Sequence, residues 1–72
     1  MINQSRQFED HDAVVYHFCN TDLHDQPYTV DRNISRDYET MTSRIHVESK
    51  TWEITTYHDE HGFVISQSIA LL

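Results

Sequence analysis

The chain of 72 residues holds little of the chemistry on which several common protein classes depend. It contains one cysteine, one glycine and one proline. A disulfide scaffold needs at least two cysteines, and loops that bring the backbone close to a phosphate group depend on several glycines. We therefore expect neither a disulfide-rich fold nor a phosphate-binding loop.

Long apolar segments are also missing. The longest runs, Ala13–Tyr16 and Ile69–Leu72, are much shorter than the roughly 20 residues that span a bilayer. The start of the sequence lacks the cationic stretch and apolar segment of a secretory signal. We expect a soluble, cytoplasmic protein without membrane contact. A chain of this size forms one small domain, which we place over residues 1–72, with residues 1–9 as a candidate flexible segment.

Positive charge is scarce. Five Lys and Arg residues stand against twelve Asp and Glu residues, so the formal net charge is −7. Proteins that bind a phosphate backbone draw mainly on clustered Lys and Arg, and direct nucleic-acid binding is therefore not expected. The acidic residues serve solubility, but they also leave a segment without any basic residue, which contains Glu9, Asp10, Asp12, Asp22 and Asp25.

The apolar and semi-apolar positions are mostly Ile, Val and Thr, while Leu occurs only at 23, 71 and 72. Such β-branched side chains favour strands. We expect a mainly β or α+β fold, built as a small antiparallel sheet of about five strands. At most one short helix, near residues 35–42, is expected beside it.

Residues 43–71 show the clearest strand pattern. Trp52, Ile54 and Thr56 alternate with more polar residues, and so do the odd positions from Phe63 to Leu71. These patterns predict a three-stranded antiparallel meander whose tryptophan side is buried.

The registers of the meander follow from the rule that cross-strand partners share a face. A loop over 48–51 would set Val47 opposite Trp52. In the second hairpin two registers stay open. A loop over 59–62 puts Trp52 opposite Ile69, whereas a turn at His61-Gly62 puts Ile54 opposite Ile69.

The N-terminal half is read as strands separated by a loop. Residues 12–19 are rich in strand formers, with Tyr16 and Phe18 on the inner face. Residues 20–27 have loop composition, and residues 28–34 resemble another strand. From Ile34 the apolar spacing becomes helical, so residues 35–42 form either a short helix or a backward extension of the strand that contains Ile45.

Six histidines offer the main possibility of site chemistry. His58 and His61 lie in a short polar segment with two acids and are the candidate metal ligands, although a structural zinc site usually needs four well-placed groups. No cofactor is expected. Cys19 is interpreted as a packed thiol, because no other part of a nucleophilic site is visible. We expect no catalytic residues and no enzymatic activity.

A single small sheet leaves edges and faces that association can cover, and symmetric dimers are the commonest solution. We expect a homodimer and a protein partner. The leading hypothesis is a non-enzymatic acidic module that blocks a basic groove of a larger protein, as phage and mobile-element accessory inhibitors of similar size and charge do. The alternatives are a metal- or pH-responsive protein built on the histidines and a structural subunit of an assembly. The candidate partner-binding residues are Glu9, Asp10, Asp12, Asp22, Asp25, Glu53 and Tyr57.

Overall fold

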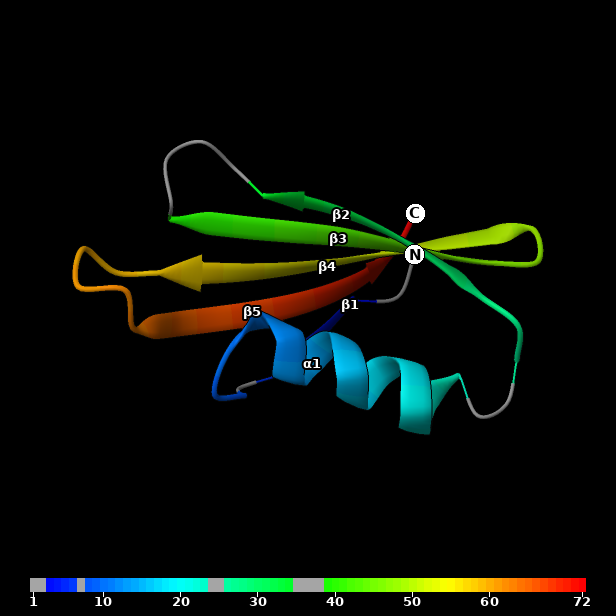
Figure 1. The fold of residues 1–72 in the computed structure, drawn as a ribbon, viewed down its shortest axis with the longest axis horizontal. Helices are drawn as coiled ribbons and strands as arrows, with labels where there is room; N and C mark the ends of the chain where they lie inside the picture. The colour runs from blue at the N-terminus through cyan, green and yellow to red at the C-terminus, as the bar shows by residue number, and fades with distance from the viewer. Residues whose placement is uncertain (1–2, 7, 24–25, 35–38) are drawn as a thin grey trace.

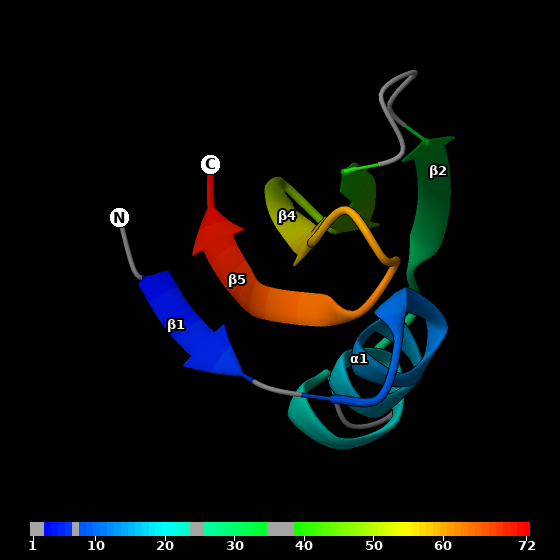
Figure 2. The same cartoon turned by 90° about the vertical axis from the view of Figure 1, so that its left-hand side faces the viewer.

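The computed structural model describes residues 3–6, 8–23, 26–34 and 39–72, and these form one antiparallel sheet with a helical segment on one face (Figures 1 and 2). The order across the sheet is β1-β5-β4-β3-β2. The bounds of the strands are β1 Asn3–Arg6, β2 Thr29–Ile34, β3 Thr40–Val47, β4 Lys50–His58 and β5 Val64–Leu71. The helix α1 spans His11–His17 and continues as a π-helical segment, Phe18–Asp22. The predicted mainly β fold class is confirmed.

The C-terminal meander is present as β3, β4 and β5. Ile54 lies opposite Ile69, and Thr56 lies opposite Gln67, so the second of the two open registers is correct. The connection is longer than the predicted His61-Gly62 turn, because β4 ends at His58 after a β-bulge and β5 begins at Val64.

The turn that joins β3 to β4 differs from the predicted one. Val47 pairs with Lys50, and Ile45 pairs with Trp52, so the loop over 48–51 and the pairing of Val47 with Trp52 are wrong. The turn is tight because Glu48 adopts a φ of 55°, a conformation that usually calls for glycine or asparagine. The register is shifted by two residues, which leaves every side chain on its predicted face.

The region around residues 35–42 is only partly described. Residues 40–42 belong to β3, so a helix over this part is wrong and the strand extension is correct. Residues 35–38 lie outside the described residues. Pairing on both sides explains the outcome: Met41 lies between Ile34 of β2 and Thr56 of β4. The strand predicted over residues 28–34 is present as β2.

The strand predicted over residues 12–19 is wrong, because this segment is the helical one. A carboxylate oxygen of Asp10 accepts the backbone N–H of Ala13 at 2.7 Å and so caps α1. The buried side chains recur at helical spacing, as His11, Val14, Val15, Phe18 and Cys19. That spacing makes one apolar face of a helix, which covers the sheet.

The position predicted for Tyr16 on an inner face is also wrong. The helix turns its side chain outward and leaves it 71% exposed. The loop expected over 20–27 begins later than predicted, because the π-helical turn runs to Asp22, and residues 24–25 lie outside the described residues. The backbone N–H of Leu23 donates to the carbonyl of Phe18 at 3.1 Å. This wider turn helps to keep Leu23 in the core.

The core lies between α1 and the central strands. Its buried apolar members are Val14, Val15, Phe18, Cys19, Leu23, Ile45, Val47, Ile54 and Ile69, with Phe8 and Trp52 packed against them. Phe63 and Ile65 were expected on the buried side, yet they are 70% and 57% exposed. Figure 1 shows that the end of the β4–β5 hairpin extends past the start of α1. The register between β4 and β5 also shifts there, so that Val64 and not Ile65 pairs with His58.

Two further predictions concern membrane contact and the N-terminal segment. None of the described residues forms a helix long and apolar enough to cross a membrane. Part of the candidate flexible segment 1–9 lies outside the described residues, namely 1, 2 and 7, while Asn3–Arg6 pair with β5. The flexibility of that segment stays a prediction.

Candidate functional site

The most organised polar cluster lies beneath the start of α1. His11 is 1% exposed and faces the sheet. Its Nδ1 lies 2.8 Å from the hydroxyl oxygen of Thr56, and its Nε2 lies 2.8 Å from the hydroxyl oxygen of Ser43. Both hydroxyl groups are buried. A neutral imidazole can donate to one hydroxyl and accept from the other, so this arrangement satisfies both ring nitrogens.

Gln67 joins this cluster to the chain that enters α1. Its amide nitrogen donates to the carbonyl of Asp10 at 3.0 Å and to the Thr56 hydroxyl at 3.3 Å. Its amide oxygen accepts the backbone N–H of Phe8. The polar interruption of β5 is therefore not a defect of an apolar strand, because it holds the start of the helix against the sheet. We call His11, Ser43, Thr56 and Gln67 the polar cluster.

The surroundings of His11 favour its neutral form. Burial is the main cause that lowers the pKa of His11 from 6.5, and Arg32 and His58 lower it further. Asp12 and Asp10 act in the opposite direction. A buried imidazole loses more solvation when it is charged than when it is neutral, and this loss outweighs the two nearby carboxylates.

The two candidate metal ligands, His58 and His61, have different surroundings. His58 is half-buried, and its Nδ1 is buried without a hydrogen-bond partner among the described residues. His61 is exposed in the β4–β5 turn, with its Nε2 3.6 Å from a carboxylate oxygen of Glu60. Within the described part of the chain, no three His, Cys, Asp or Glu side chains are grouped closely enough to hold an ion. The metal site stays a prediction.

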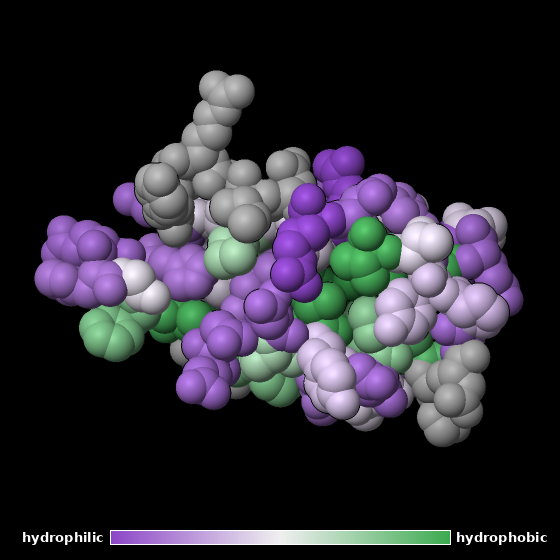
Figure 3. Space-filling model, in the orientation of Figure 1, coloured by the Kyte–Doolittle hydropathy of each residue, from purple (hydrophilic) through white to green (hydrophobic). Residues whose placement is uncertain are grey.

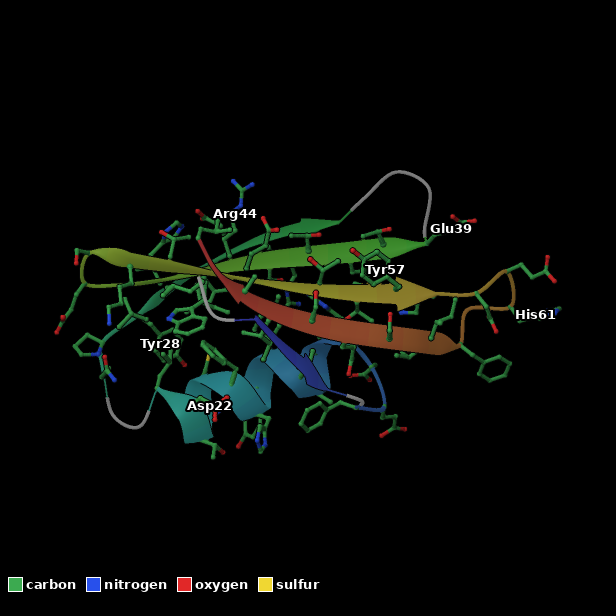
Figure 4. All side chains as sticks on the ribbon, turned by 180° about the vertical axis from the view of Figure 1, so that it is seen from behind. Asp22, Tyr28, Glu39, Arg44, Tyr57 and His61 are labelled. Atoms are coloured by element: carbon green, nitrogen blue, oxygen red, sulfur yellow. The ribbon has the colours of Figure 1, made fainter. Side chains whose placement is uncertain are left out.

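Four of the acidic candidates lie on the helical segment or directly before it: Asp12 and Asp22 are part of it, and Glu9 and Asp10 precede it. Glu9, Asp10, Asp12 and Asp22 are all exposed. Asp22, labelled in Figure 4 near the end of the helical segment, lines a pocket together with Glu48, Lys50 and Trp52 of the β3–β4 hairpin. Asp10 caps α1, and Asp12 forms an ion pair with Arg32 at 3.0 Å. No Lys or Arg occurs between residues 8 and 23. Asp25 lies outside the described residues.

Glu53 and Tyr57 lie on the other face of the sheet. They share odd positions of β4 with Thr55, whereas Ile54 and Thr56 face the helix. Glu53 pairs with the Arg44 guanidinium at 3.1 Å, and Tyr57 is exposed (Figure 4). The structure therefore divides the predicted partner-binding residues between two surfaces and does not bring them together.

A groove runs between α1 and the edge strand β2, with a volume of about 360 Å³. Figure 3 shows apolar surface on this side of the molecule, bordered by hydrophilic side chains. The side chains that line the groove are Asp12, Val15, Tyr16, Cys19, Asn20, Tyr28, Val30 and Arg32. Burial raises the pKa of the Cys19 thiol, which favours the protonated and unreactive form and agrees with a packed role.

Sequence reasoning missed both the polar cluster and this groove. Each depends on α1, in the region where the sequence pattern predicts a strand over residues 12–19. Two signals were present: an Asp before the segment at a capping distance, and apolar residues at 14, 15, 18 and 19. Read together they predict a helix with His11 on its inner face.

Comparisons with known proteins give no relative: no family model, no curated protein and no solved structure matches this chain. Function is therefore argued from the residues and their geometry.

Proposed function

We propose that this chain is a non-enzymatic, acidic protein-binding module that acts by occupying a basic groove of a larger protein. The observation that carries the proposal is that residues 8–23, which include the helical segment, contain four exposed acids, Glu9, Asp10, Asp12 and Asp22, and no Lys or Arg. We call these four residues the acidic surface. Asp12 is paired with Arg32 of β2. By size and charge alone, a phage or mobile-element accessory inhibitor in the cytoplasm is the nearest analogy.

The geometry supports this role because the helical segment is packed on the sheet through its apolar side. A partner can therefore contact the exposed side of the segment without disturbing the core. Exposed acidic side chains steer a basic partner at long range and set its orientation, and added salt screens this attraction.

The test is capture of partners by the immobilised protein at low salt and again at about 0.5 M salt, where the Debye length is only a few ångströms. We expect identified partners with basic grooves that are lost at high salt. A double variant, Glu9→Gln with Asp22→Asn, should weaken capture. The matched control is Glu48→Gln with Glu60→Gln, which removes the same charge at exposed turns. Equal capture by both variants, or capture that resists salt, would contradict the proposal.

A second candidate function, a pH-responsive protein, is favoured by the buried His11 of the polar cluster. Protonation of His11 would place a charge beneath the start of α1, beside Arg32 and His58. The metal-responsive form of this candidate rests on His58 and His61. Calorimetric titration with zinc, repeated on His58→Ala with His61→Ala, tests it: binding that the double variant abolishes supports a site there, and heat that it leaves unchanged opposes one.

A further inference from the structure

We propose that two copies of this chain pair through the free edges of their β2 strands, with Val30 of each copy opposite Val30 of the other on a two-fold axis. This inference gives a location and a register to the homodimer expected from the sequence. It depends on that homodimer, and of the four residues of the acidic surface it involves Asp12, which lines the groove. It starts from the edge strand and the groove beside it.

The outer edge of β2 is open in the described structure. Among the described strands, β2 has β3 as its one neighbour and lies at the end of the sheet. Its residues from Thr29 to Arg32 are all exposed, as is Tyr28 just before it. The apolar side chains there include Tyr28, 44% exposed, and Val30, 38% exposed. An unpaired edge with apolar flanks is a template for a further strand.

The charges on β2 do not protect this edge. The Arg32 guanidinium lies 3.0 Å from a carboxylate oxygen of Asp12, and a carboxylate oxygen of Asp31 lies 2.9 Å from Nε2 of His46. Both charges therefore have a partner within the same copy. Edge charges discourage strand addition, but a second strand that meets Asp31 and Arg32 need not leave either charge without a partner, because each keeps one in its own copy.

The outer face of the sheet is a poorer surface for a second copy. Its side chains at the centre are largely hydroxyl-bearing or charged, including Thr42, Arg44, Thr51, Glu53 and Thr55. Covering such a face would remove polar groups from water without an apolar gain. The edge of β2 is thus favoured over face-to-face packing.

Symmetry then restricts the register. A two-fold axis perpendicular to the sheet pairs the strands antiparallel, and directly opposite residues lie on the same face. An axis at Asp31 would set two carboxylates opposite each other, and an axis at Arg32 would set two guanidinium groups opposite each other. Like charges in directly opposite positions are destabilising. An axis at Val30 avoids both.

The register centred on Val30 is also complementary along its length. It places Tyr28 opposite Arg32 of the second copy, where a guanidinium can stack on the aromatic ring. It places Thr29 opposite Asp31 of the second copy, where the hydroxyl can donate to the carboxylate. Because the axis is perpendicular to the sheet, both helices lie on one side. The grooves of the two copies then meet, and the apolar side chains at positions 28 and 30 lie between them.

The experiment measures the mass of the intact chain in solution by sedimentation equilibrium across the micromolar range, with circular dichroism to show that each variant is folded. Val30→Lys and Val30→Glu, tested singly, should each weaken dimerisation by about tenfold or more, equivalent to about 1.4 kcal/mol. The two variants mixed should form a heterodimer, because opposite charges then meet at the axis. A third variant, Val30→Cys, should form an interchain disulfide on mild oxidation, since directly opposite residues lie at disulfide distance.

The matched control is Ile65→Lys, which introduces the same charge at another exposed apolar residue and should leave the dimer intact. A wild-type chain that is monomeric throughout overturns the proposal. A dimer that survives Val30→Lys and Val30→Glu, or that Ile65→Lys abolishes, also overturns it. Salt-sensitive capture of a basic partner by the Val30→Lys variant separates this result from the proposed function.

Discussion

The two ends of the interface between α1 and the sheet are built on different principles. At the end near Trp52 the contacts are apolar, and the Phe18 and Trp52 rings lie 5.4 Å apart. At the end near His11 the contacts are hydrogen bonds to buried hydroxyl groups. Apolar burial is not directional and stabilises many related packings, whereas the polar cluster is satisfied in few arrangements. The apolar end thus supplies most of the stability, and the polar end fixes how α1 lies on the sheet.

The largest expected effect is at the apolar end. Phe18→Ala removes a side chain that is almost fully buried, and such changes cost about 3–5 kcal/mol through lost burial and the cavity that remains. For a domain this small we expect most of the native state to be lost. Urea unfolding followed by circular dichroism measures it. Tyr16→Ala, on the exposed side of the same helix, should change the free energy of unfolding by no more than about 0.5 kcal/mol.

The next effect is at the polar end. His11→Ala leaves the Ser43 hydroxyl buried without its partner, at about 1–3 kcal/mol for an unsatisfied group, while the Thr56 hydroxyl keeps the hydrogen bond from Gln67. A triple variant, His11→Leu with Ser43→Ala and Thr56→Val, removes the imidazole and both hydroxyl groups and should recover part of that loss, because Gln67 still donates to the carbonyl of Asp10. The same unfolding measurement tests both variants. If the triple variant were less stable than His11→Ala, an unsatisfied hydroxyl group would not explain the loss in His11→Ala. The contrast between a hydrogen-bonded end and an apolar end of the interface would then be wrong.

The third effect is a dependence of stability on pH. Because burial holds the pKa of His11 below 6.5 in the folded state, the unfolded chain binds more protons than the folded one between that lowered pKa and 6.5. The contribution of the neutral His11 to the free energy of unfolding should therefore be complete above about pH 6.5. Below that pH the free energy of unfolding should fall, by at most about 1.4 kcal/mol per pH unit for one proton. Thermal unfolding at several pH values measures this. The triple variant should lack this part of the pH dependence, and an unchanged profile would show that His11 does not cause it.

The smallest effect concerns the cap of α1. Asp10→Ala removes the carboxylate that accepts the Ala13 N–H and should cost about 1 kcal/mol. Asp10→Asn keeps an acceptor and should cost much less. The backbone carbonyl of Asp10, which accepts from Gln67, is unchanged in both. Equal losses in the two variants would show that charge, and not the hydrogen bond, stabilises the start of the helix.

The meander was predictable because its evidence is local. Alternation from Trp52 to Thr56 and from Gln67 to Leu71 identifies the strands and their buried side, and the parity of positions limits the registers. The turn at Glu48 was not predictable, since neither it nor Ser49 is a residue that usually marks a tight turn. The exposure of Phe63 was not predictable either, because the register of β4 and β5 shifts beside it and α1 begins elsewhere along the sheet.

The helix was missed for a different reason. Residues 12–19 alternate well enough to resemble a strand with two apolar faces, and Val14 and Val15 are β-branched. Tertiary structure decides between the two patterns, because the face of β3, β4 and β5 needs a cover. A helix with His11, Val14 and Phe18 on one side supplies it. The local preference of these residues for a strand is weaker than the free energy gained by burying the apolar face of the sheet.

The sequence by itself determined the antiparallel meander, the faces of its strands and the excess of acidic charge, because these follow from neighbouring residues and composition. Only the tertiary structure decided that residues 11–22 are helical, that His11 is buried against Ser43 and Thr56, and that β2 is left as an open edge. The physical reason is that burial and hydrogen-bond partnership depend on residues far apart in the chain, which no local pattern records.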